Sequence, residues 1–193
     1  LLVDAFAAAV DEHDAVHAGG FMAPLKGALG VTCDEYLPLR PGDAAAVVLD
    51  DGTELPFSAW AEDLALAGAE VIGTYAGGPA DGAPAITRHS TGEGHAWYVS
   101  AQLTTDALAA VYARVYADAW VEPQRLPEGV EVVTRRGDEE DFVVVLNHGD
   151  QEVRLPIAGT DVLTGGMPVG EVTVASGGAA VVRVPLTGQG GEA

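Results

Sequence analysis

Five histidines and one cysteine are the side chains whose types suit metal binding or nucleophilic catalysis in this chain. His13 and His17 have the four-residue spacing of a helical metal site, but their segment DEHDAVHAGG ends in a double glycine and predicts a loop. His89 and His95 flank a predicted turn, and no third ligand is evident beside them. His148 lies in NHGD, where a turn is predicted. We therefore predict no metal site.

A nucleophilic cysteine requires a sharp glycine-flanked turn and a histidine partner. Cys33 lies in GVTCDEY, where the adjacent Asp34 and Glu35 should raise the pKa of the thiol and disfavour the thiolate. GxGxxG, Walker and nucleophile-elbow patterns are absent from the sequence. We predict no catalytic or cofactor-binding residue and no cofactor. A freestanding amidotransferase-like enzyme that uses Cys33 and a histidine is kept as the alternative hypothesis.

The charge balance restricts the partners. The 193 residues include 29 acidic and 9 basic side chains, a formal net charge of −20. Such a surface repels nucleic acid and anionic membranes, which bind clustered Lys and Arg, so neither partner is expected. It is typical of a solvated acidic surface or of adaptation to high salt. The single cysteine excludes an intrachain disulfide and favours a cytoplasmic location.

One segment organises the first part of the chain. Residues 85–102 predict a strand, a turn that holds Gly92 and Gly94, and a second strand rich in aromatic and β-branched residues. Thr104 and the residues after it have the composition of a helix start, and a helix is predicted over 107–119. This hairpin therefore delivers the chain from a sheet into a helix.

Other elements of this region are predicted from local patterns. Residues 24–30 predict a short helix, and 11–20 and 77–84 predict loops. In the segment WAEDLALA, the alternation of Trp60, Glu62, Leu64 and Leu66 favours a strand. Further strands are predicted at 31–38, 44–49, 53–57 and 69–75.

A proline-rich linker at 123–127 precedes a second region with a different pattern. Six short β-prone runs separated by turns predict a small antiparallel β-sandwich over 128–187, followed by a flexible tail at 188–193. A carbohydrate-binding role for this module is disfavoured, because Phe142 is its only aromatic residue and sugar platforms need several rings.

The order of five motifs resembles a known family. The segments AEVIGTY, PAITRH, GEGHAWYVS, LPEGVEVV and LNH together resemble the C-terminal half of a family 42 glycoside hydrolase, a β-galactosidase. The resemblance implies a flavodoxin-like (class I glutamine amidotransferase-like) α/β domain over 1–122 that forms a homotrimer. A small antiparallel β domain follows. Both catalytic glutamates of the family lie in a preceding (β/α)8 barrel, so no residue here inherits their roles.

The resemblance also implies the partners of this chain. They are two further copies, the parent's barrel domain, and a small β-galactoside that the barrel binds. Tryptophan is enriched at buried contacts. Trp97 is predicted to be core, whereas Trp60 and Trp120 are each either ordinary packing residues or interface anchors. The candidate interface residues are Trp60 and the loop residues Gly77, Gly78 and Pro79. The family more often has Ser-Gly-Ile or Ser-Gly-Val where this chain has three alanines at 7–9.

Overall fold

The computed structural model describes residues 1–40, 42–43 and 45–186, so the predicted tail at 188–193 lies outside the described residues. The chain forms two compact units, Leu1–Pro123 and the residues from Gln124 onward. Residues 121–127, which span the boundary between the two units, have no regular secondary structure. Within the described part of the chain, no helix is long and apolar enough to cross a membrane.

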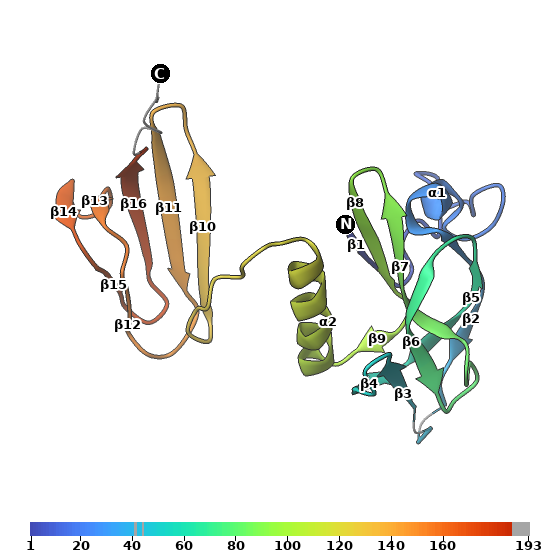
Figure 1. Ribbon diagram of the computed structural model, residues 1–193. Coiled ribbons are helices and arrows are strands. Elements are labelled where there is room, and N and C mark those ends of the chain that lie inside the picture. The colour runs from blue at the N-terminus through green and yellow to red at the C-terminus, as the bar shows by residue number, and fades with distance from the viewer. Residues whose placement is uncertain (41, 44, 187–193) are drawn as a thin grey trace. The chain divides into compact units, whose positions relative to one another are not determined.

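Unit 1 is built on a mixed seven-stranded sheet (Figure 1). Its strands, in spatial order, are β1 (Leu2–Asp4), β8 (Gly94–Val99), β7 (Pro84–Thr91), β6 (Glu70–Ala76), β3 (Ala46–Leu49), β4 (Glu54–Ser58) and β9 (Gln102–Leu103). A separate antiparallel pair and three helical segments complete the unit: β2 (Val31–Pro38) with β5 (Trp60–Leu66), η1 (Ala23–Leu25), α1 (Lys26–Leu29) and α2 (Thr105–Asp118).

Of the predicted flavodoxin-like α/β fold, the structure confirms a mixed sheet with a helix after it. In the described residues, only β1 and β8 pair in parallel, while the other strand pairs are antiparallel. A parallel connection requires a crossover of a dozen or more residues. The turns that join β3 to β4 and β7 to β8 are far shorter than that, so these neighbours form hairpins.

The side chains of β8 are buried on both faces of the sheet. Successive side chains of a strand point to opposite faces. Trp97 and Val99 enter one apolar cluster, which includes Val111 of α2. Ala96 and Tyr98 enter a second cluster, which includes Leu29 of α1 and residues of β2 and β5. The nearly continuous apolar sequence of β8 is therefore what a doubly covered strand needs.

Helix α2 is capped at its N-terminus and bonded to the hairpin near its C-terminus. At its N-terminus, the side chain of Thr104 accepts a hydrogen bond from the Ala107 N–H at 3.4 Å, as the helix-start signature predicts. Near its C-terminus, the Asp118 carboxylate accepts bonds from Trp97 Nε1 at 2.9 Å and from an Arg88 guanidinium nitrogen at 3.0 Å. His95 Nδ1 lies 2.9 Å from the same carboxylate.

Unit 2 is antiparallel throughout its described strands. A five-stranded sheet has the order β10 (Val130–Arg136), β11 (Glu140–Asn147), β16 (Ala179–Pro185), β13 (Gly159–Asp161) and β14 (Met167–Val169). Strands β12 (Val153–Leu155) and β15 (Val172–Val174) form a second, smaller sheet. Both sheets contribute to one apolar core, in which Val145, Val174 and Val182 are almost fully buried.

Candidate interface surface

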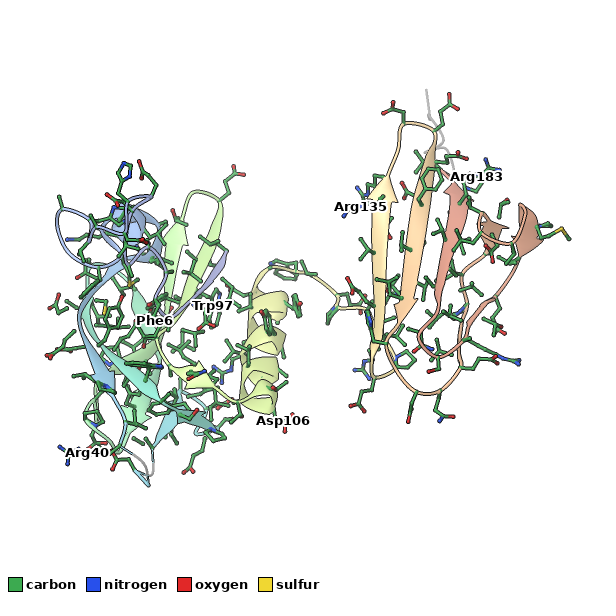
Figure 2. The ribbon with its side chains drawn as sticks, turned by 180° about the vertical axis from the view of Figure 1, so that it is seen from behind. Phe6, Arg40, Trp97, Asp106, Arg135 and Arg183 are labelled. Atoms are coloured by element: carbon green, nitrogen blue, oxygen red, sulfur yellow. The ribbon has the colours of Figure 1, made fainter. Side chains whose placement is uncertain are left out.

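Trp60, the residue singled out as a possible interface anchor, belongs to a group of contacting aromatic rings. Its ring meets the Phe6 ring edge-on at 5.2 Å, and Phe6 stacks on Tyr36 at 4.6 Å. Phe21 lies 4.5 Å from Tyr36 on centroids. We call Phe6, Phe21, Tyr36 and Trp60 the aromatic patch; Phe6 is labelled in Figure 2. Phe6 is 41% exposed and Trp60 is 37% exposed, so both rings face solvent in one copy of the chain.

Backbone strain supports the two exposed rings of the aromatic patch. Phe6 has φ 63°, Ala8 has φ 49°, and Ala59, directly before Trp60, has φ 64°. A left-handed conformation costs a residue with a side chain roughly 1–2 kcal/mol. Strain of this kind is retained where the surrounding structure enforces it, and it gathers at functional positions.

A buried carboxylate enforces the conformation at Phe6. Glu62 of β5 is fully buried, and its Oε1 accepts the Phe6 N–H at 3.1 Å. Its Oε2 accepts the hydroxyl of Tyr98 at 2.5 Å. Burial raises the pKa of Glu62, although both hydrogen bonds favour the ionised form. The backbone at Phe6 is therefore tied through Glu62 to β8 of the seven-stranded sheet.

A second buried hydroxyl fixes the backbone of Glu62. The Glu62 N–H donates to the hydroxyl of Tyr75 at 3.1 Å. The Tyr75 hydroxyl donates to the Ser100 carbonyl at 2.6 Å, and the Ser100 hydroxyl donates to the Ala85 carbonyl at 2.7 Å. Burial raises the pKa of Tyr75 to about 12, so this hydroxyl remains a donor at neutral pH. The chain of bonds spans β5, β6 and β7 and makes the support rigid.

The predicted interface loop 77–79 and Trp60 each lie near Pro38. Pro38 pairs with Trp60 across the β2–β5 ladder. Pro38 also borders an open hollow of about 380 Å³, whose described lining is Pro38, Arg40, Asp43, Gly78 and Pro79. The loop is held by a bond from the Gly77 N–H to Asp81 Oδ1 at 2.7 Å. Trp60 does not line this hollow, so the interface role of Trp60 and of the loop stays a prediction.

Cys33 does not meet the requirements of a nucleophile. It lies in β2, is 2% exposed, and its Sγ donates to the Glu35 carbonyl at 3.5 Å. Burial, followed by the charge of Glu62, raises the pKa of the thiol to about 12. A buried thiol with a raised pKa lacks the exposure and the thiolate character of a reactive cysteine, which argues against the alternative amidotransferase hypothesis.

The histidine pairs do not converge on a metal. In the β7–β8 register Ser90 faces His95, so the preceding residue His89 points to the other side of the sheet. His89 Nδ1 lies 3.0 Å from the Ala28 carbonyl oxygen, whereas His95 contacts Asp118. Within the described residues, no group of three or more His, Cys, Asp or Glu side chains could hold a metal ion.

Sequence reasoning missed Phe6, Glu62 and Tyr98 as a connected set. A signal was present, because the alternation over 60–66 places Glu62 on the same strand face as the apolar Leu64. A carboxylate on an apolar strand face indicates a buried, hydrogen-bonded acid. Its partners are 56 and 36 residues away in the sequence, so no local pattern identifies them.

Fold and surface together define a two-domain β-rich region with an exposed aromatic patch. Two family descriptions match it: a β-galactosidase trimerisation domain over residues 1–122, and a β-galactosidase C-terminal domain over residues 129–184. The chain belongs to the family 42 β-galactosidases and corresponds to the C-terminal part of those enzymes.

Individual relatives agree with this assignment. The chain is 34% identical over 158 residues to β-galactosidase BgaB of Geobacillus sp. (strain Y412MC61), covering 81% of this chain and 23% of that protein. It is 35% identical over 184 residues to a β-galactosidase of Arthrobacter sp., covering 94% of this chain and 26% of that protein. The chain therefore spans about a quarter of the length of these relatives.

Solved structures show the same fold. The β-galactosidase of Bacillus circulans sp. alkalophilus superposes with a TM-score of 0.77 at 24% identity, covering 95% of this chain and 28% of that one. A polyextremophilic β-galactosidase from the Antarctic haloarchaeon Halorubrum lacusprofundi superposes with a TM-score of 0.68 at 26% identity, covering 94% of this chain and 27% of that chain.

Proposed function

We propose that this chain is the non-catalytic, trimer-forming region of a β-galactosidase that hydrolyses terminal non-reducing β-D-galactosides. The observation that carries the proposal is the match of residues 1–122 to a β-galactosidase trimerisation domain. Its role is geometric, since three copies hold three catalytic barrels around one axis. A retaining glycosidase needs two carboxyl groups about 5–5.5 Å apart. The two acids that the described residues bury are engaged elsewhere: Glu62 is bonded to Phe6 and Tyr98, and Asp161 accepts the N–H groups of Leu163 and Thr164.

Light scattering after size exclusion tests the proposal. The chain has a mass of 19.7 kDa, so a trimer has a mass of 3 × 19.7 = 59.1 kDa. A peak near the trimer mass supports the proposal, and a peak at the monomer mass at both low and high salt contradicts it. Hydrolysis of a chromogenic β-galactoside by the same sample should stay at the buffer rate. A protein-dependent rate would contradict the non-catalytic role.

We also infer that the mixed sheet of unit 1 is part of a flavodoxin-like sheet in the parent protein. The parallel pair β1–β8 and the helix α2 after it support this inference. A cytoplasmic location is proposed as well, supported by the single Cys33, which is free and buried.

A further inference from the structure

We propose that unit 1 binds a small methylated ammonium ion in a hollow beside Trp60. This hollow, which we call the Trp60 hollow, has a volume of about 290 Å³ and is lined by Asp4, Ala5, Phe6, Trp60 and Gln102. Small-molecule sites begin at roughly 300 Å³, so the Trp60 hollow suits a ligand of few heavy atoms. The site goes beyond the proposed function and does not depend on it, because one copy of the chain supplies the whole described lining.

Two aromatic rings form a corner of the Trp60 hollow. The ring planes of Phe6 and Trp60 are 90° apart, and their centroids are separated by 5.2 Å. Both side chains are exposed, so a ligand has access to the corner between them. The face of an aromatic ring carries the negative part of its quadrupole and attracts a cation, and tryptophan attracts it most strongly. A corner of perpendicular rings therefore favours a positively charged ligand.

Asp4 adds a negative charge to the wall of the Trp60 hollow. Its Oδ1 accepts the Ala5 N–H at 2.8 Å, and among the described residues its carboxylate forms no ion pair. Burial is the main cause of the raised pKa of Glu62, and the charge of Asp4 raises it further, so the two carboxylates repel each other. A cation beside Asp4 relieves this repulsion. The net charge of −20 also raises the local concentration of cations around the chain.

The lining favours a methylated ammonium ion over a metal ion or a bare ammonium group. Calcium takes roughly six to eight oxygen ligands, whereas Asp4 is the one carboxylate in the described lining. A primary ammonium group is strongly hydrated, and aromatic rings do not replace the hydrogen bonds of its water shell. Methyl groups surround the charge with apolar surface that packs on aromatic faces, which is how aromatic cages recognise choline and methylated lysine.

One ring of the corner is held in place before a ligand binds. The Phe6 N–H donates to Glu62 at 3.1 Å, and this bond helps to hold the left-handed φ of 63° at Phe6. A site that is already ordered loses little conformational freedom when it binds. Trp120 differs, because it is 96% exposed and belongs to none of the aromatic pairs of the described residues.

Titration of the whole chain with choline tests the site, with the indole N–H signals in nitrogen–proton correlation spectra as the readout. The chain has three tryptophans, and replacing each in turn by phenylalanine assigns the three signals. Choline should shift the Trp60 signal saturably and leave the signals of Trp97 and Trp120 unchanged. The neutral analogue of choline, in which carbon replaces nitrogen, has the same shape without the charge and should bind roughly 10-fold more weakly.

Two variants with matched controls locate the site. Asp4→Asn removes the charge and keeps an oxygen that can accept the Ala5 N–H, while Glu93→Gln removes one charge from an exposed position in the β7–β8 turn. Phe6→Leu removes one ring of the corner, while Phe142→Leu makes the same change in unit 2. Asp4→Asn and Phe6→Leu should each weaken choline binding roughly 3-fold or more, and both controls should bind as the wild type does.

The outcomes decide for or against the site. A saturable Trp60 shift that is weaker with the neutral analogue and in the Asp4 and Phe6 variants supports it. Absence of a saturable shift overturns it, and so does equal binding of the neutral analogue. Equal weakening in Asp4→Asn and Glu93→Gln also overturns it, because net charge alone would then be the cause. The comparison of choline with its analogue uses the wild-type chain, so it decides the question even if a variant does not fold.

Discussion

Replacing Tyr98 by phenylalanine should destabilise unit 1 by about 2–3 kcal/mol. The change removes one hydroxyl from a buried pair and leaves the ring in place. The Tyr98 hydroxyl and the Glu62 carboxyl are both fully buried, and they are joined at 2.5 Å. A hydrogen bond to a charged group contributes about 1.5–3 kcal/mol, and the acceptor left in the interior finds no water to replace it.

The loss should depend on pH. Burial raises the pKa of Glu62 above its ordinary 4.5, so the folded state binds this proton more tightly than the unfolded state does. Glu62 therefore contributes stability that is fully present below about pH 4.5 and is lost as pH rises through its folded-state pKa. The bond from Tyr98 lowers that pKa. Its removal should thus cost more at the alkaline side of this window, where the stronger, ionised acceptor is present.

Urea unfolding between pH 5 and pH 9 measures this effect. Tyr112→Phe is the control, since Tyr112 is 40% exposed and the change should cost less than about 0.5 kcal/mol. In a double-mutant cycle, Tyr98→Phe should lose much of its effect in a Glu62→Gln background. Additive effects in that cycle, or a loss that does not change with pH, would refute the reasoning that the carboxylate and the hydroxyl act as a pair.

Three further outcomes are expected. Asn147→Ala should lower the stability of unit 2 by roughly 2–4 kcal/mol in thermal unfolding, because this buried amide donates to the carbonyls of residues 151, 174 and 175. Asp150→Ala, a change at an exposed residue, should leave the stability of unit 2 almost unchanged. Ala8→Gly should raise the unfolding midpoint of unit 1, by about 0.5–1 kcal/mol in stability, since it relieves φ 49°, and a lower midpoint would argue against strain there. Cys33 should react with iodoacetamide only after denaturation, and fast labelling of the native chain at pH 7 would show the thiol to be accessible.

The elements that the sequence predicts well are those specified locally. The hairpin at β7 and β8, the helix α2 with its Thr104 cap, and the strand at Trp60 all follow from turn glycines, a capping residue and alternation within a few residues. In unit 2, the six short β-prone runs correspond to strands, and β14, whose sequence is Met-Pro-Val, is a seventh strand outside those runs.

The features that the sequence did not predict depend on distant partners. The parallel pairing of β1 with β8 joins Leu2 to Trp97, and no short pattern signals it. The left-handed conformation of Phe6 is unexpected for a bulky residue, and it becomes intelligible only with Glu62 beneath it. The sequence therefore singled out Trp60, whereas the contact of its ring with Phe6 required the structure.

The most direct test of the central claim, that this region assembles by itself, is sedimentation equilibrium of the wild-type chain at low and at high salt. We expect a single species of 59.1 kDa, three times the 19.7 kDa of one chain, and tighter association at high salt, where the repulsion between copies of charge −20 is screened. A mass of 19.7 kDa at both salt concentrations and at all protein concentrations would contradict it.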